Sequence, residues 1–276
     1  MTQLAPPGGV DRVVIFPVAN MFSSPTDDAD VVSQAILGSN VTSVENRGDW
    51  VKVRTDDDYA GWMSRDTLRE LANLILYGSV PPVIRIEALF ANVYREPSVR
   101  THQPVLTAPF DSLLEVSAEG PVHEPGWTRV RLPDRRTGWI RSEDGSSNLA
   151  PLSIPESIEL AKRFLGVPYL WGGRSSFGFD CSGFTQMLVR RRGITMPRDA
   201  NLQAAWEGVE EISRRDLRKG DLVFFGSAPE KITHTAHYIG GGEIIHSTAE
   251  NRPGVQIGRL NARPSVRNLV ACRRLR

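Results

Sequence analysis

An internal repeat in the first 150 residues constrains the fold of this 276-residue chain more than any other feature. The segment Trp50 to Arg54 (WVKVR) is echoed by the segment Trp127 to Arg131 (WTRVR). A Gly-Trp pair follows in both copies, and the two tryptophans of each copy are 12 residues apart. A third match comes earlier in each copy, with VANMFSSP from Val18 against FANVYREP from Phe90. Three ordered matches predict two copies of one small domain.

Each copy has the pattern of short β-strands. Val51 and Val53 alternate with polar residues, as do Val130 and Leu132, which is typical of half-buried strands. Several short strands in one small unit close best as a barrel, because closure leaves no exposed edge. In their GDWVKV and GW patterns the copies resemble bacterial SH3-like domains. We therefore predict two such barrels, at residues 1–78 and 79–150, with tryptophans in their cores.

The remainder of the chain has a different pattern. Residues 142–155 (SEDGSSNLAPLSIP) are rich in Ser, Gly and Pro and predict a linker. Helix patterns and then strand patterns follow, which indicates an α+β domain at residues 151–276. The expected helices cover about residues 156–165, 181–192 and 199–206. The expected strands cover 221–225, 235–239, 243–246 and 268–273.

Charge and hydropathy exclude several classes of function. Thirty-three basic and 32 acidic residues give a net charge of +1, which argues against binding nucleic acid by bulk electrostatics. No apolar run approaches the ~18–20 residues that span a bilayer. Residues 1–11 lack the basic flank and apolar core of a signal peptide. Two cysteines fit a reducing compartment. We expect a cytoplasmic protein, or an exported one if a signal peptide has been removed.

The segment FDCSGF, residues 179–184, places Cys181 at the start of a predicted helix. The unsatisfied N–H groups and positive end of a helix favour the thiolate, which is the nucleophilic form of cysteine. A lone cysteine is also common as a small buried apolar residue, so the interpretation depends on partners. Cys272 lies within a predicted strand and is interpreted as structural.

Two histidines provide those partners. His234 and His246 flank three glycines at 240–242, and a hairpin folded there would bring the two imidazoles together. One imidazole could then accept the thiol proton while the other orients it. His237 comes three residues after His234 and is expected on the opposite face of the strand, as a bystander. This placement also argues against a zinc site built from Cys181 and the three histidines.

Four motifs occur in order between about residues 155 and 273: PYLWGG, FDCSGF, GDLVFF and the segment from His234 to His246. Together they resemble the NlpC-type papain-like cysteine peptidases of bacterial cell-wall metabolism. The separations of 53 residues between Cys181 and His234 and of 12 between the histidines are typical of that family. With two SH3-like domains ahead, the chain resembles the γ-D-glutamyl-L-diamino-acid endopeptidases. The resemblance implies a papain-like α+β catalytic domain preceded by two all-β barrels.

The resemblance also implies residue roles. Cys181 would be the nucleophile, His234 the general base and His246 the residue that orients the imidazole. Tyr169 would help the Cys181 N–H hold the oxyanion. The implied substrate-binding residues are Asp180 and Ser182 at the D-glutamyl portion, Asp199 at the free amino group of an N-terminal L-alanine, and Asp30 and Tyr59 of the first barrel as a wall of that subsite.

Two positions depart from the family pattern. Ala200 stands where serine is frequent, so one hydrogen bond to substrate would be missing or relocated. Ala236 stands where glycine is usual and could crowd the base. Both departures bear on substrate preference more than on reaction type, because no catalytic group is lost.

The implied reaction is hydrolysis of the γ-D-glutamyl–diamino acid bond of peptidoglycan stem peptides that carry a free N-terminal L-Ala, in murein peptide recycling. No cofactor or metal is expected. One alternative is a cell-wall-binding module with a degenerate peptidase, and another is an acyltransferase or amidase using the same thioester. The sequence leaves open meso-diaminopimelate or L-lysine as the diamino acid, the length of the stem peptide and the oligomeric state.

Overall fold

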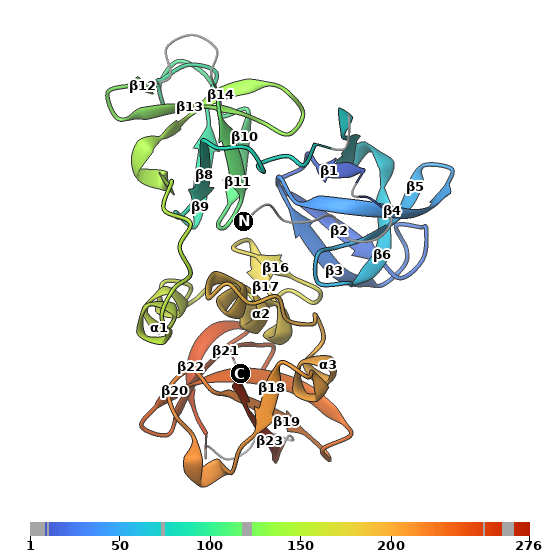
Figure 1. The fold of residues 1–276 in the computed structure, drawn as a ribbon, viewed down its shortest axis with the longest axis vertical. Coiled ribbons are helices and arrows are strands. Elements are labelled where there is room, and N and C mark those ends of the chain that lie inside the picture. Colours follow the sequence, from blue (N-terminus) through green and yellow to red (C-terminus); the bar gives the residue numbers. More distant parts are fainter. Residues whose placement is uncertain (1–8, 10, 73–74, 118–122, 251, 261–267) are drawn as a thin grey trace. The chain divides into compact units, whose positions relative to one another are not determined.

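The computed structural model describes residues 9, 11–72, 75–117, 123–250, 252–260 and 268–276. The chain divides into two units, Met1–Leu149 and Ala150–Arg276 (Figure 1). Most of the N-terminal segment that was assessed for a signal peptide lies outside the described residues. The first unit is built from strands, and the second combines three α-helices with a sheet.

The first half of the N-terminal unit is an antiparallel sheet of seven strands in the order β3-β2-β6-β5-β4-β1-β7. Alternate side chains of its strands, such as Val51 and Val53, are fully buried, as the period-2 pattern predicts. The strands are β1 (Arg12–Val14), β2 (Val18–Phe22), β3 (Val31–Ile36), β4 (Asn40–Arg47), β5 (Trp50–Arg54), β6 (Ala60–Ser64) and β7 (Leu68–Glu70), with a short 3-10 turn at Arg65–Thr67.

The second half repeats this plan with its strands divided between a six-stranded sheet and a two-stranded sheet. The order β12-β13-β11-β8-β15 is joined by β14, which pairs with β13, while β9 and β10 form a separate pair. The three repeated motifs lie on corresponding strands, β2 and β9, β5 and β13, and β6 and β14. The strands are β8 (Val83–Ile86), β9 (Phe90–Val93), β10 (Leu106–Pro109), β11 (Leu113–Val116), β12 (His123–Glu124), β13 (Trp127–Arg131), β14 (Thr137–Arg141) and β15 (Gly145–Ser146).

Tyr77 ties the two halves of this unit together. Its backbone exchanges hydrogen bonds of 2.9 and 3.0 Å with the side chain of Asn40 in β4. Its hydroxyl donates to the carbonyl of Arg131 at 2.5 Å and accepts from the N–H of Glu115 at 3.2 Å. Burial raises the pKa of this phenol, so the hydroxyl keeps its proton and both bonds at neutral pH.

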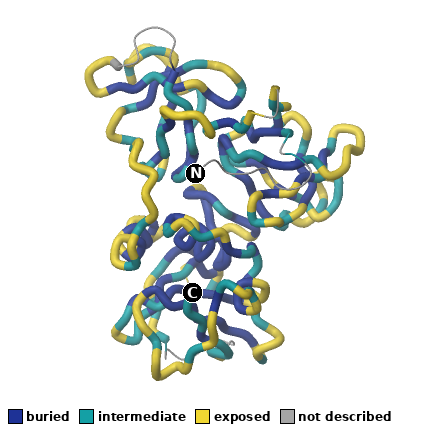
Figure 2. The backbone as a smooth tube through the Cα atoms, in the orientation of Figure 1, coloured by how far each residue is buried: buried dark blue, intermediate teal, exposed yellow. Residues whose placement is uncertain are grey.

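The C-terminal unit is a six-stranded antiparallel sheet, β18-β23-β19-β20-β21-β22, combined with helices. Helix α2 contacts β20, β21 and α1, and every α2 residue except Arg190 is buried (Figure 2). The elements are α1 (Ile154–Lys162), β16 (Arg174–Ser175), β17 (Gly178–Phe179), α2 (Cys181–Arg191), α3 (Ala200–Ala205), β18 (Val209–Glu211), β19 (Leu222–Gly226), β20 (Ile232–Gly240), β21 (Glu243–Thr248), β22 (Gly254–Arg259) and β23 (Asn268–Leu275).

The segment predicted as a linker is more ordered than expected. Its first part forms a 3-10 turn (Ser142–Asp144) and then β15, which pairs with β8. Helix α1 begins at Ile154, because Ser153 caps it in a reciprocal bond with Glu156 and Pro155 is compatible with a first helical turn. The regular helix ends at Lys162 and not at residue 165.

Candidate active site

Cys181 is the first residue of α2 and is 9% exposed. The preceding residue, Asp180, is the N-cap, and its carboxylate accepts the Gly183 N–H at 2.7 Å. The backbone N–H of Cys181 belongs to the first helical turn, where intrahelical acceptors are lacking. The fold therefore presents a thiol and an unsatisfied donor at the same point.

The turn before α2 packs closely on the helix. The Asp180 N–H donates to the carbonyl of Gly173 at 3.2 Å, and that carbonyl lies against Gly183. A Cβ atom at position 183 would lie 2.1 Å from the Gly173 oxygen, so only glycine fits there. The loop that carries Trp171 and Gly172 is thus fixed to the first turn of α2.

The environment of Cys181 differs from the sequence-based expectation. The pKa of the thiol is raised to about 11, chiefly by burial and to a smaller extent by the negative charge of Asp180. Hydrogen bonding from the backbones of Thr235 and Ser182 and the charge of Arg198 act in the opposite direction without overcoming burial. The helix N-terminus therefore does not make a free thiolate here, and the cysteine needs a base. The contact with Thr235 places the thiol beside the residue that follows His234.

The two histidines meet as the hairpin predicts. His234 in β20 and His246 in β21 are joined by a bond of 2.7 Å between Nε2 and Nδ1. The turn between their strands uses Gly240, Gly241 and Gly242 at φ values of 95°, 63° and 76°, a conformation that glycine adopts without strain. A proton on His234 Nε2, donated to His246, leaves Nδ1 as the basic nitrogen of His234.

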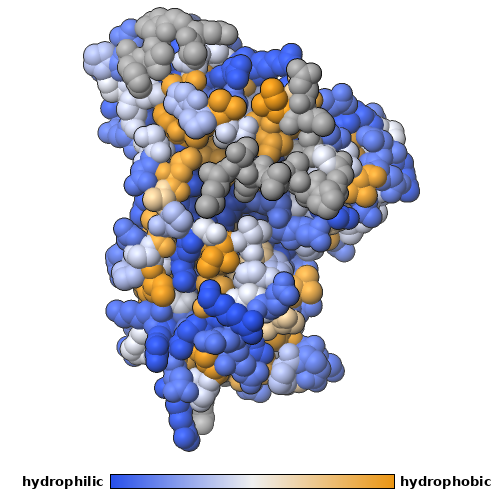
Figure 3. All heavy atoms as spheres, in the orientation of Figure 1, coloured by the Kyte–Doolittle hydropathy of each residue, from blue (hydrophilic) through white to orange (hydrophobic). Residues whose placement is uncertain are grey.

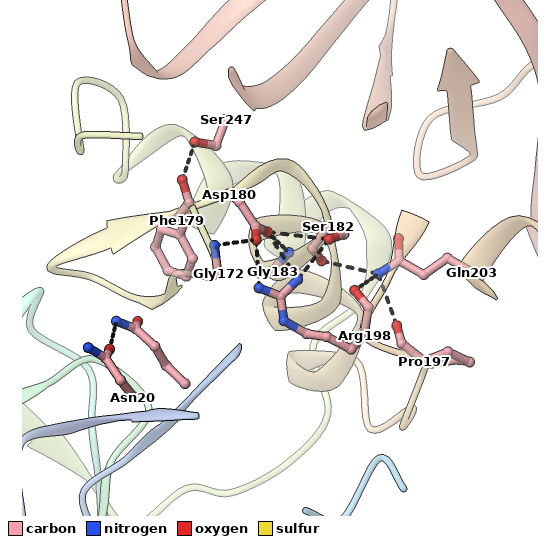
Figure 4. Close-up of polar contacts among 11 residues, drawn as sticks. Asn20, Gly172, Phe179, Asp180, Ser182, Gly183, Pro197, Arg198, Gln203 and Ser247 are labelled. Carbon is pink, nitrogen blue, oxygen red and sulfur yellow. Dashed lines mark hydrogen bonds and ion pairs between the residues drawn. The ribbon is translucent and has the colours of Figure 1, made fainter. Parts of the chain in front are cut away.

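A buried hydrogen bond links this hairpin to the segment that carries Cys181. The Ser247 hydroxyl donates to the Phe179 carbonyl at 2.7 Å (Figure 4). Ser247 follows His246 in the chain and is fully buried, and Phe179 lies two residues before Cys181. The bond therefore fixes the strand of the second histidine against the turn that carries the thiol.

His237 faces α2 and not the other histidines. Its Nε2 lies 3.3 Å from the carbonyl oxygen of Thr185, and burial lowers the pKa of His237 to about 4. The expected bystander role agrees with this position. Among the described residues no group of three or more His, Cys, Asp or Glu side chains is arranged to hold a metal ion.

The other predicted site residues lie at different places. Tyr169 bridges to Phe179 and is half-buried, and Asp199 is half-buried at the N-cap position of α3. Asp180 and Ser182 are buried. In the N-terminal unit, Asp30 is exposed, whereas Tyr59 packs against the core of the first sheet. Their contacts with substrate stay predictions.

The two departures from the family pattern are both buried. Ala200, at the start of α3, is 8% exposed, and Ala236 is fully buried in a core cluster with Val223 and Ile244. The extra methyl group at position 236 thus contributes to the sheet's core packing.

Sequence reasoning missed Arg198. Its guanidinium is buried at 1% exposure and binds both carboxylate oxygens of Asp180 (Figure 4). Arginine is seldom buried unless it is paired, so the residue type alone gave no reason to expect Arg198 in the interior. The available signal was its place directly before Asp199, in a segment already singled out for substrate binding.

The surface is predominantly polar on the face drawn in Figure 3, where hydrophobic side chains form separate patches. Among the described residues, no helix has the length and apolar character that crossing a bilayer requires.

Comparison with protein families gives matches along most of the chain. The NlpC/P60 family matches residues 166–274. The bacterial dipeptidyl-peptidase Sh3 domain matches residues 21–68, and the GW (Gly-Tryp) dipeptide domain matches residues 83–144. The last two matches fall on the first and the second half of the N-terminal unit, respectively.

Individual relatives match over nearly the same span. A gamma-D-glutamyl-L-lysine dipeptidyl-peptidase of Bacillus cereus is 35% identical over 260 residues, 88% of this chain and 74% of the relative. Dipeptidyl-peptidase 6 of Lysinibacillus sphaericus is 28% identical, over 87% of this chain and 88% of the relative. The crystal structure of an NlpC/P60 family protein from Bacillus cereus has a TM-score of 0.81 at 29% identity, covering 96% of this chain and 99% of that one. Sequence, fold and the cysteine–histidine geometry agree that this chain belongs to the NlpC/P60 family and is a cysteine peptidase.

Proposed function

We propose that the enzyme hydrolyses the amide between the γ-carboxyl of D-glutamate and a diamino acid in peptidoglycan stem peptides with a free N-terminal L-alanine. The observation that carries this proposal is the buried Cys181 beside a hairpin whose histidines are bonded at 2.7 Å. The substrate class is supported by relatives named for γ-D-glutamyl-L-lysine cleavage.

Acylation begins with transfer of the Cys181 proton to Nδ1 of His234. Because burial keeps the thiol neutral, this transfer creates the thiolate and an imidazolium together. The Nε2–H of His234 donates a hydrogen bond to Nδ1 of His246, which orients the ring and stabilises the imidazolium. The thiolate attacks the γ-glutamyl carbonyl, and the departing amine of the diamino acid takes the proton from His234.

Stabilisation of the oxyanion and hydrolysis of the thioester both take place at Cys181. The Cys181 N–H and the Tyr169 hydroxyl donate to the tetrahedral oxyanion, and one such donor lowers the barrier by about 3–4 kcal/mol. Water, deprotonated by His234, then hydrolyses the acyl-enzyme. The D-glutamyl portion contacts the backbone and side chains at Asp180 and Ser182.

Recognition of the free N-terminal amine would restrict the enzyme to peptides that have been released from the glycan strands. Asp199 holds the ammonium group of the L-alanine, because an ammonium removed from water must be paired. In this proposal the barrels are separate domains, at residues 1–78 and 79–150, ahead of the catalytic domain at 151–276. Peptides still attached to glycan strands lack that amine, so the proposed role is recycling of released murein peptides in the cytoplasm.

Hydrolysis of L-Ala-γ-D-Glu-meso-diaminopimelate tests the proposal, beside the L-lysine peptide and the N-acetylated form of each. We expect release of L-Ala-D-Glu from free peptides, loss of activity in Cys181→Ala and retention in Cys272→Ala, whose thiol lies in β23. The relative rates on the two free peptides identify the preferred diamino acid.

Each contrary outcome has a definite meaning. Equal cleavage of the acetylated peptides would exclude amine recognition and with it the recycling role. Transfer of L-Ala-D-Glu to an added amine in place of water would identify an acyltransferase. Binding without any cleavage would identify a wall-binding module.

A further inference from the structure

Arg198 places a full positive charge inside the catalytic unit. Its side chain is 1% exposed and lies in the segment between α2 and α3. Nη2 donates to Oδ2 of Asp180 at 2.6 Å, and Nη1 donates to Oδ1 at 3.1 Å. Nη1 also donates to the Ser182 hydroxyl at 2.7 Å. The arginine therefore hydrogen-bonds to the side chains on both sides of Cys181, Asp180 and Ser182.

Asp180 has two structural tasks that require a carboxylate. Oδ1 caps α2 by accepting the Gly183 N–H at 2.7 Å, and Oδ2 accepts the Gly172 N–H at 3.0 Å (Figure 4). The same negative charge adjoins Cys181 and opposes ionisation of its thiol. The Asp180 carboxylate is thus needed to hold the first turn of α2 and the Gly172 loop. Formation of the Cys181 thiolate, however, requires that a nearby positive charge compensate this carboxylate.

We propose that Arg198 is a positioning residue for the reaction. It compensates the charge of Asp180, so that one carboxylate caps the nucleophile helix and fastens the Gly172 loop without suppressing the thiolate. This inference rests on the proposed role of Cys181 as the nucleophile. It assigns Arg198 no contact with substrate.

Gln203 in α3 holds this arrangement from the other side. Its side chain is fully buried, and Nε2 donates to the carbonyls of Ser182 at 3.1 Å, Pro197 at 3.0 Å and Arg198 at 3.2 Å (Figure 4). One amide group therefore bonds both the first turn of α2 and the backbone that carries the guanidinium. A carboxylate–arginine pair fixed at both ends has little freedom to separate.

Other charged or titratable groups of this unit also bear on the measurement. His234 of β20 and His246 of β21 belong to the proposed catalytic set. Asp199 adds negative charge beside Arg198, and His237 lies against α2 as a neutral imidazole. These four residues are the same in every variant at positions 180 and 198, so differences between variants report on the Asp180–Arg198 ion pair.

The experiment measures the pH midpoint of Cys181 alkylation by iodoacetamide, with the Cys181 peptide quantified by mass spectrometry. Cys272 in the same digest is the internal control. The variants are Arg198→Met, Arg198→Lys, Asp180→Asn and the double variant Asp180→Asn/Arg198→Met. Near-ultraviolet circular dichroism verifies folding, and kcat and KM are measured on the free peptide.

If Arg198 compensates the charge of Asp180, the pH midpoint of Cys181 alkylation should shift in opposite directions in Arg198→Met and Asp180→Asn. Arg198→Met raises the midpoint by about one pH unit or more, since loss of an opposite charge at this range has such an effect. Asp180→Asn lowers the midpoint, and the double variant returns it toward the wild-type value. Arg198→Lys keeps the positive charge but loses the two-pronged hydrogen bonding of the guanidinium, so it shifts the midpoint less than Arg198→Met does. At pH 7 the Arg198→Met change lowers kcat about tenfold, with a smaller change in KM.

An unchanged midpoint in folded Arg198→Met, or a double variant shifted as far as that single variant, would overturn the proposal and leave Arg198 a packing residue. If Arg198→Met fails to fold, Asp180→Asn and Arg198→Lys still decide. A midpoint that does not fall in Asp180→Asn, with Arg198→Lys shifted by a unit or more, also overturns it. Alkylation requires no turnover, so the result is independent of whether Cys181→Ala abolishes hydrolysis.

Discussion

Acid should loosen the nucleophile helix through His237. This imidazole is buried between β20 and α2, with a pKa lowered from 6.5 to about 4, by burial first and by the charge of Arg192 to a smaller extent. The folded protein therefore binds this proton less readily than the unfolded chain. Stability is fully present above pH 6.5 and falls as the pH drops from 6.5 toward 4.

The size of the effect follows from the two pKa values. Each unit of difference corresponds to about 1.4 kcal/mol, so lowering the pH from 7.5 to 5 removes about 2 kcal/mol. Below pH 4 the loss reaches about 3 kcal/mol. The group is fully buried, so solvent screening does not reduce these values appreciably.

Hydrogen exchange of α2 amides, corrected for the intrinsic exchange rate at each pH, measures the helix opening free energy directly. The wild type should lose about 2 kcal/mol more than His237→Gln between pH 7.5 and 5, because glutamine does not titrate. His102→Gln is the matched control, since His102 is an exposed histidine of the N-terminal unit. Equal losses in wild type and His237→Gln would refute the assignment of acid sensitivity to His237.

Three substitutions test other contacts. Gly183→Ala places a Cβ 2.1 Å from the Gly173 oxygen and should lower kcat about 100-fold by displacing the nucleophile, measured on the free peptide; a kcat near wild type would contradict that close packing. Ser247→Ala removes the bond to Phe179 and should destabilise the catalytic unit by about 1–2 kcal/mol in urea denaturation, with an unchanged midpoint as the contrary result. Tyr77→Phe should cost the N-terminal unit about 1–2 kcal/mol by hydrogen exchange of β13 amides, and unaltered exchange there would show that the hydroxyl contributes nothing.

Features set by local pattern could be predicted from the sequence. The repeated Trp motifs fall on β5, β6, β13 and β14, because alternation along a strand is visible in a few residues. The pairing of His234 and His246 follows from two strands and a glycine turn, which are also local.

Features that depend on burial by segments distant in the sequence could not be predicted in this way. The pKa of Cys181 is raised by burial and by the negative charge of the N-cap carboxylate, whereas the helix end alone predicts the opposite direction. Arg198 turns inward to a partner 18 residues away, and no periodic pattern reports such a pairing. The start of α1 was misplaced because Pro155 was interpreted as a linker residue and not as part of a first helical turn.

The glycine-turned hairpin has a consequence for how the catalytic machinery assembles during folding. The two histidines are 12 residues apart, whereas Cys181 is 53 residues from His234. Closing the longer loop costs about 1 kcal/mol more chain entropy than closing the shorter one, and hairpins form within microseconds. The proposed base and its partner can therefore assemble within one local element, and the proposed active site is completed when the separate helix that carries the thiol docks onto it.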